Sequence, residues 1–204
     1  QLEVIPGTET LDPTFGVPAK WISEAYREEA EMLGLTVVDV PSIIATHMTE
    51  TFKAYAYELL GRQETRMIIE HVKEMQPALV EDLIPDELGV GEVQKVLRNL
   101  LRERISIRNL LVIFETLNEQ SGYTKDPDIL TEYVRQALAR QISQQYAGEE
   151  NVIRVITLSP SLEKKLIDGL QRSERGTQLL LDPNTTQQLL QQINDQIGNL
   201  VKKG

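Results

Sequence analysis

Residues 39–64, DVPSIIATHMTETFKAYAYELLGRQE, decide the fold because they predict one long helix that joins the segments on either side. Asp39 or Ser42 can supply the N-cap oxygen, Pro41 fits the first turn, and Gly61 is suited to end the helix. Apolar side chains recur every three or four residues, which is the repeat of one helix face. We expect this stripe to be core: Ile44, Met48, Phe52, Tyr55 and Leu59.

The residues before this helix predict a small α/β module. Residues 2–5 and 35–40 are rich in β-branched or apolar side chains and predict strands. Between them, prolines and a glycine in residues 11–23 predict an ordered loop, and Ser23 can cap a short helix. A strand, helix, strand, helix order is typical of an α/β or α+β module.

The pattern changes after Gly61. Residues 63–146 have helical periodicity almost throughout, whereas residues 151–158, NVIRVITL, predict a strand followed by a helix capped by Ser159. We therefore predict a mainly helical α+β chain with three parts: an incomplete α/β module (1–62), a helical module (63–148) and a second incomplete α/β module (149–204). Because lone strands expose unpaired backbone groups, we expect further sequence before Gln1 and after Gly204.

Composition excludes several classes of function. The 204 residues carry a formal charge of −10, which disfavours binding to nucleic acid or anionic lipid through bulk electrostatics. The chain has no cysteine, so disulfides, thiolate catalysis and cysteine zinc sites are excluded. The longest aliphatic or aromatic run, residues 110–114, is too short to cross a bilayer.

Patterns typical of catalysis or cofactor binding are missing. His47 and His71 lie far apart in sequence without a metal-binding motif, and Gly89 and Gly91 lack the rest of a phosphate loop. We expect no enzymatic activity, no cofactor and no metal.

A basic stretch around residues 95–108 allows two interpretations. The helices on either side of residues 105–107 are compatible with a helix-turn-helix that binds nucleic acid, but the acidic chain makes this the weaker alternative. The basic side chains can instead contact the acidic run 64–87 of a neighbouring copy, in a head-to-tail contact that closes into a ring. The basic residues are Lys95, Arg98, Arg102, Arg104 and Arg108.

Three stretches resemble a known family: LDPTFGVPAKWI from Leu11, VVDVPSIIATHM from Val37 with LGRQE from Leu60, and VLRNLLRERISIRNL from Val96. They are similar to the C-terminal cytosolic region of the FlhA family, the large export-gate component of the flagellar type III secretion apparatus. The resemblance continues through residues 115–135 and covers nearly the whole chain.

The resemblance implies a cytosolic docking platform of the protein export gate. Such proteins form a ring, bind export chaperones that carry flagellar cargo, and work with components of the export ATPase complex. They are held in the bacterial inner membrane by an N-terminal region that this chain lacks, so this segment is expected on the cytoplasmic side. The alternative is the homologous gate component of a virulence injectisome, and the DPTF motif with Thr46 favours the flagellar branch.

The resemblance also implies a docking site. The family's docking residues match Asp12 and Phe15 in the DPTF motif and Thr46 in the ATH motif, with Ile43 one helical turn before Thr46. An exposed aromatic residue beside a carboxylate and a threonine suits a partner helix. From the residues alone, the favoured interpretation is structural: Asp12 is a turn residue before proline, Phe15 a core residue and Thr46 a surface helix position. With the resemblance, docking is favoured.

Overall fold

The computed structural model of the chain describes residues 4–147, 151–153, 155–173 and 176–202. Packing divides the chain into two units, residues 1–138 and 139–204. Helices dominate both units and the strands are short, which confirms the predicted mainly helical α+β class. The division into three modules at residues 62 and 148 stays a prediction.

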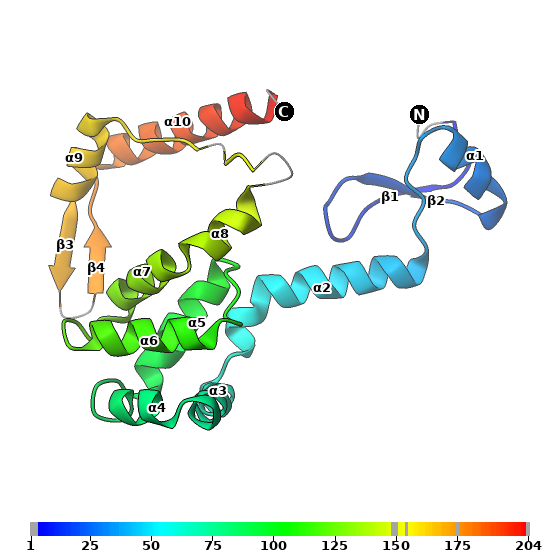
Figure 1. Ribbon diagram of the computed structural model, residues 1–204. Helices are drawn as coiled ribbons and strands as arrows, with labels where there is room; N and C mark the ends of the chain where they lie inside the picture. Colours follow the sequence, from blue (N-terminus) through cyan, green and yellow to red (C-terminus); the bar gives the residue numbers. More distant parts are fainter. Residues whose placement is uncertain (1–3, 148–150, 154, 174–175, 203–204) are drawn as a thin grey trace. The chain divides into compact units, whose positions relative to one another are not determined.

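A two-stranded antiparallel hairpin begins the first unit (Figure 1). Strand β1, Thr8–Leu11, pairs with β2, Pro18–Trp21, so that Thr8 lies opposite Trp21. The base of the hairpin is close-packed, because a Cβ on Gly7 would lie 2.3 Å from the Trp21 carbonyl oxygen. A 3-10 helix, η1 (Glu24–Tyr26), and helix α1 (Arg27–Met32) follow. The loop that joins β1 to β2 extends beyond the last paired residues, Leu11 and Pro18.

Helix α2, Val40–Leu59, is the long helix expected from the sequence. The Asp39 carboxylate accepts the Ser42 N–H at 2.8 Å and Pro41 lies in the first turn, which confirms the predicted start. Gly61 follows the end of α2 closely and is the N-cap residue of α3, Arg62–Met75. Helix α4, Pro77–Leu83, comes next.

The core of the first unit is a bundle around α5, Val90–Arg102. Helix α5 packs against α2, α3 and α7 (Pro127–Ala137), while α6 (Leu110–Ser121) packs against α4 and α7. The side chains that point inward are fully buried: Val93, Leu97, Leu100, Phe114, Leu117, Leu130 and Val134. Their spacing of three or four residues along each helix is the reason these helices form a bundle.

Polar contacts fix the C-terminal end of α2 on this bundle. The Gln94 side chain donates to the Leu60 carbonyl oxygen at 2.9 Å. The Arg102 guanidinium lies 5.2 Å from the centre of the Tyr57 ring, a distance at which a cation attracts an aromatic face. Helix α2 is thus held at its end by α5.

The second unit contains α8 (Ala139–Tyr146), α9 (Pro160–Asp168), α10 (Pro183–Lys202) and a hairpin of β3 (Leu170–Ser173) with β4 (Gly176–Leu179). In this antiparallel hairpin Leu170 lies opposite Leu179. Ser159 caps α9, as predicted, by accepting the Leu162 N–H at 3.3 Å.

Predicted strands fail at two places. Residues 35–39 are irregular and residue 40 already belongs to α2, and residues 151–158 are irregular wherever the structure describes them. The predicted strand at residues 2–5 lies partly outside the described residues, and Val4 and Ile5 form no strand. A run of β-branched residues becomes a strand only when a neighbour pairs its backbone groups. In the described part of the chain, each sheet contains only its own two hairpin strands.

The predicted core role of the α2 stripe is also wrong for the described residues. The exposed fractions of Ile44, Met48, Phe52, Tyr55 and Leu59 lie between 50% and 62%. Helix α2 packs through a different face, whose half-buried residues follow one another at helical spacing: Ile43, Glu50, Ala54 and Tyr57. Periodicity identified a stripe on the helix without indicating which side the neighbouring elements cover.

Across the ranges that the structure describes, no helix is both long enough and apolar enough to span a bilayer.

Candidate partner-docking site

The loop between β1 and β2, residues 12–17, forms a closed turn that we call the hairpin tip. One carboxylate oxygen of Asp12, Oδ1, accepts the N–H groups of Thr14 and Phe15, each at 2.8 Å. The main chain of Asp12 adds two further bonds, from its N–H to the Val17 carbonyl and from the Gly16 N–H to its own carbonyl. Gly16 has φ +66°, a conformation that suits glycine. Asp12 therefore shapes the tip.

Phe15 projects from the hairpin tip into solvent. Its exposed fraction is 68%, and Leu11 and Val17 beside it are 62% and 52% exposed. An aromatic side chain exposed to this degree gains little from the fold, so Phe15 is not a core residue. Large apolar groups gathered on a projecting loop are typical of an interaction surface.

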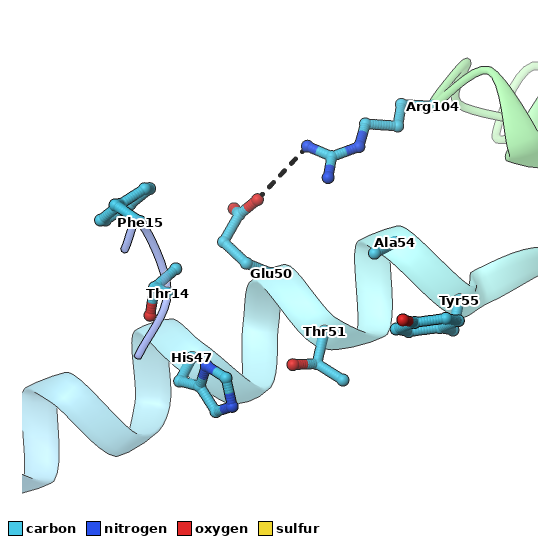
Figure 2. Close-up of a pocket in the computed structure, with 8 residues that line it drawn as sticks. All are labelled: Thr14, Phe15, His47, Glu50, Thr51, Ala54, Tyr55 and Arg104. Carbon is cyan, nitrogen blue, oxygen red and sulfur yellow. Dashed lines mark hydrogen bonds and ion pairs between the residues drawn. The ribbon is translucent and has the colours of Figure 1, made fainter. Parts of the chain in front are cut away.

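The hairpin tip borders a cavity of about 280 Å³ on α2 (Figure 2). The tip contributes Thr14 and Phe15, and Arg104 comes from the segment after α5. The remaining walls come from α2: His47, Glu50, Thr51, Ala54 and Tyr55. Aromatic and methyl groups make part of the surface, and hydroxyl and charged groups make the rest.

One wall carries a hydroxyl with an unmet hydrogen bond. Thr14 Oγ1 is buried and has no hydrogen-bond partner among the described residues. Buried polar atoms are normally paired, so this unpaired hydroxyl is an unusual feature of the residue that lines the cavity.

The negative charge of Glu50 is paired with two positive side chains, Lys53 and Arg104. Glu50 Oε1 accepts from Lys53 Nζ at 2.7 Å, and Glu50 Oε2 lies 3.5 Å from Arg104 Nη1. The Lys53 hydrogen bond, and then the charges of Lys53 and Arg104, hold the pKa of the Glu50 carboxyl below its usual value despite some desolvation. Figure 2 shows Glu50 pointing from α2 toward Arg104. This ion pair links the cavity wall to the helical bundle.

The predicted site residues occupy different positions. Phe15 lines the cavity, whereas Asp12 is half-buried and directs its carboxylate to the backbone of the hairpin tip. Thr46 is exposed on α2, one turn before Glu50, and Ile43 is half-buried one turn earlier. Thus Phe15 and the turn of α2 that follows Thr46 line the same cavity, while Asp12, Ile43 and Thr46 do not line it. Their role in docking stays a prediction.

Sequence reasoning missed several cavity residues. Arg104 lies 54 positions from Glu50, and no local pattern connects the two. Thr14 stands inside the DPTF motif, and Glu50, Thr51 and Ala54 follow the ATH motif at helical spacing, so helical periodicity was the available signal for these residues. In the described part of the chain, no cluster of three or more histidine or acidic side chains is arranged to hold a metal.

Comparisons with known proteins agree on one family. The model of the FHIPEP family matches residues 1–204. The flagellar biosynthesis protein FlhA of Bacillus subtilis is 51% identical over 191 residues, which are 94% of this chain and 28% of that protein. The chain thus spans little more than a quarter of the length of this relative.

Solved structures share the fold. The CdsV protein in the Chlamydia pneumoniae CdsV and CdsO complex has a TM-score of 0.79 and 28% identity, covering 87% of this chain and 52% of that one. The nonameric EscV cytosolic domain from the type III secretion system has a TM-score of 0.69 and 29% identity, covering 84% and 52% of the two chains. With the family model matched from end to end and the fold shared, this chain belongs to the FHIPEP family.

Proposed function

We propose that this chain is part of the cytosolic docking platform of a flagellar type III protein export gate, and that it binds export chaperones carrying their cargo at the hairpin tip. The observation that carries the proposal is Phe15, an aromatic side chain that is 68% exposed and borders a cavity on α2. Exposed aromatic anchors beside a pocket are typical of the residues that contribute most to binding.

The cavity suits one large side chain of a partner helix. An apolar cavity of about 150 Å³ can hold a benzene ring, so a cavity of about 280 Å³ is large enough for a bulky side chain. Phe15 and Tyr55 offer apolar contact, and Thr51 offers a hydroxyl group. Helices commonly bind by inserting such anchors at helical spacing. Asp12, Ile43 and Thr46 extend the proposed docking surface around this cavity.

Sequence identity favours the flagellar branch over the injectisome branch. The Bacillus subtilis relative is a flagellar biosynthesis protein at 51% identity, whereas the type III secretion domain EscV is 29% identical. The nucleic-acid alternative loses support, because Arg102 stacks on Tyr57 and Arg104 pairs with Glu50 inside the chain. We therefore propose transport rather than catalysis, at the cytoplasmic side of the bacterial inner membrane.

Self-assembly into a ring is part of the proposal. The EscV domain is nonameric, which supports further copies of this chain as one kind of partner. A component of the export ATPase complex is the other kind that we propose, and CdsV was solved in complex with a second protein, CdsO. For the ring, we propose that the basic surface around Arg98 contacts acidic side chains of residues 64–87 in the next copy. Arg98→Glu should weaken self-association in sedimentation velocity, and Lys164→Glu, at an exposed position on α9, is the charge-reversal control. Unchanged self-association of Arg98→Glu would remove this contact from the proposal.

Capture of a chaperone tests the docking function. The immobilised chain should retain a purified flagellar export chaperone bound to its cargo, and Phe15→Ala should reduce the retained amount severalfold. Tyr123→Ala is the matched control, because Tyr123 is an aromatic residue with an exposed fraction of 85% that lies outside the cavity. Equal retention by both variants and the wild type would reject the hairpin tip as the docking site.

A further inference from the structure

We propose that Arg104 is a positioning residue: by pairing with Glu50, its side chain fixes the middle of α2 on the helical bundle and so holds one wall of the cavity in place. This inference rests on the proposed docking function. Two features of Arg104 support it, a backbone conformation that usually belongs to glycine and a side chain that reaches a helix distant in sequence.

Helix α5 ends in a Schellman motif, a turn that usually has glycine as the first residue beyond the helix cap. The Ile105 N–H donates to the Leu100 carbonyl oxygen at 2.9 Å. The Arg104 N–H donates to the Leu101 carbonyl oxygen at 3.0 Å. Ile105 and Leu100, the apolar pair of the motif, are both buried. The turn is therefore complete, yet Arg104, with φ +59°, occupies the position that usually belongs to glycine.

Helix α1 ends in the same motif and has glycine at this position. The Leu35 N–H donates to the Ala30 carbonyl oxygen at 3.0 Å, and Gly34 has φ +74°. The Gly34 N–H donates to the Glu31 carbonyl oxygen at 3.0 Å. Because a Cβ crowds the backbone in the left-handed conformation, an arginine lowers stability where glycine does not. Strain of this kind is expected where the side chain has a function.

The side chain of Arg104 reaches α2. Its Nη1 lies 3.5 Å from Glu50 Oε2, and both side chains line the cavity (Figure 2). Glu50 lies about 13 Å before the end of α2, measured along the helix axis. The contact of Arg102 with Tyr57 lies nearer to that end. The Arg104–Glu50 pair therefore fixes α2 at the level of the cavity.

The packing of α2 makes such a contact important. No residue of α2, which the structure describes from end to end, is fully buried. Helix α5, in contrast, buries four apolar side chains. A helix with few buried side chains changes its angle to the bundle at low cost. Without the Arg104–Glu50 pair, α2 holds the cavity wall in the binding position for a smaller fraction of the time, and the affinity falls by that fraction.

Two substitutions separate the backbone of Arg104 from its side chain. Arg104→Gly removes the guanidinium and relieves the strain, whereas Arg104→Ala removes the guanidinium and keeps the strain. Arg104→Gly should therefore unfold at a higher urea midpoint than Arg104→Ala. In calorimetry with a purified flagellar export chaperone–cargo complex, both should bind about threefold more weakly than the wild type.

Arg104→Lys keeps a positive charge within reach of Glu50 and should restore the affinity of the wild type. An affinity loss that follows the urea midpoint, larger in Arg104→Ala than in Arg104→Gly, would make Arg104 a residue of the fold alone. Failure of Arg104→Lys to restore binding would also overturn the positioning role.

Glu50 shows whether Arg104 acts through α2. Glu50→Gln removes the other half of the pair, so it should weaken binding as much as Arg104→Gly, and both changes together should weaken it no further. Lys53→Gln is the matched control, because it breaks an ion pair of Glu50 that lies within α2, and it should leave the affinity unchanged. Additive losses, or normal binding by Glu50→Gln, would mean that Arg104 contacts the partner directly.

Spin labels report the position of α2 without a partner. The chain has no cysteine, so Ala45→Cys on α2 and Glu119→Cys on α6, both at exposed positions, provide one labelled pair. Double electron–electron resonance should give a broader distance distribution when Arg104→Gly is added, and Lys53→Gln should leave the distribution unchanged. An identical distribution with and without Arg104→Gly would overturn the inference.

Failure of the docking function would look different. Phe15→Ala would then leave the affinity for the chaperone–cargo complex unchanged, which rejects docking at the hairpin tip. The spin-label distances would still decide whether Arg104 holds α2 on the bundle.

Discussion

Two phenylalanines in the first unit should lose very different amounts of stability on truncation to alanine. Phe114 on α6 is fully buried, so Phe114→Ala should lower the free energy of unfolding by about 3–5 kcal/mol, the usual loss for a buried phenylalanine. Phe15 is 68% exposed, which leaves roughly a third of its surface buried. Since full burial of such a side chain contributes about 1.5–3 kcal/mol, Phe15→Ala should lower the free energy of unfolding by only about 0.5–1 kcal/mol.

Urea unfolding followed by far-ultraviolet circular dichroism measures both losses. The slope of the unfolding free energy against urea should be the same in the wild type and both variants, so that shifts in midpoint report stability alone. A loss above about 2 kcal/mol for Phe15→Ala would exceed what its exposure allows. That result would make Phe15 a packed residue and refute its role as an exposed anchor.

Two further predictions follow from polar contacts in the first unit. Asn99 Nδ2 joins α5 to α7 by donating to Asp128 Oδ1 at 3.0 Å and to Thr131 Oγ1 at 3.2 Å. Asn99→Ala should therefore destabilise the bundle by about 1 kcal/mol, seen as a lower urea midpoint, and an unchanged midpoint would mean that this link contributes nothing. For Glu50, whose pKa is lowered in the folded chain, the ionised carboxyl stabilises the fold above the ordinary glutamate pKa, and this contribution is lost as pH falls through the folded value. The difference in melting temperature between wild type and Glu50→Gln should thus shrink on acidification from pH 7 to about pH 3. A constant difference would contradict the ion-pair account.

Local signals in the sequence were sufficient for the start of α2. The Asp39 cap and Pro41 act within one turn, so the residues that form the contact are neighbours in the chain. The bundle was predicted for a similar reason, because the buried positions of α5, α6 and α7 recur at helical spacing.

Contacts with distant partners were not predictable from local pattern. The stripe through Met48 and Phe52 was periodic, yet α2 packs through the face of Ala54 and Tyr57, because that face meets the rest of the first unit. The strand predicted at residues 35–40 failed for a related reason, since a strand depends on a neighbour that the sequence of the strand does not specify.

The candidate site was predictable in part. The family resemblance predicted Phe15 as a docking residue, and in the structure this side chain is exposed and borders the cavity on α2. The hydrogen bonds of Asp12 reach only two and three residues along the chain and agree with the turn residue that the sequence alone indicates. The pairing of Arg104 with Glu50 crosses 54 positions and leaves no local signature, so the far wall of the cavity required the folded structure.

Site-directed photo-crosslinking tests docking at the hairpin tip most directly. A photoreactive phenylalanine analogue in place of Phe15 should crosslink to a purified flagellar export chaperone bound to its cargo, while the same analogue in place of the exposed Tyr123 should not. A crosslink from position 123 with none from position 15 would contradict the central claim that the partner docks on the hairpin tip.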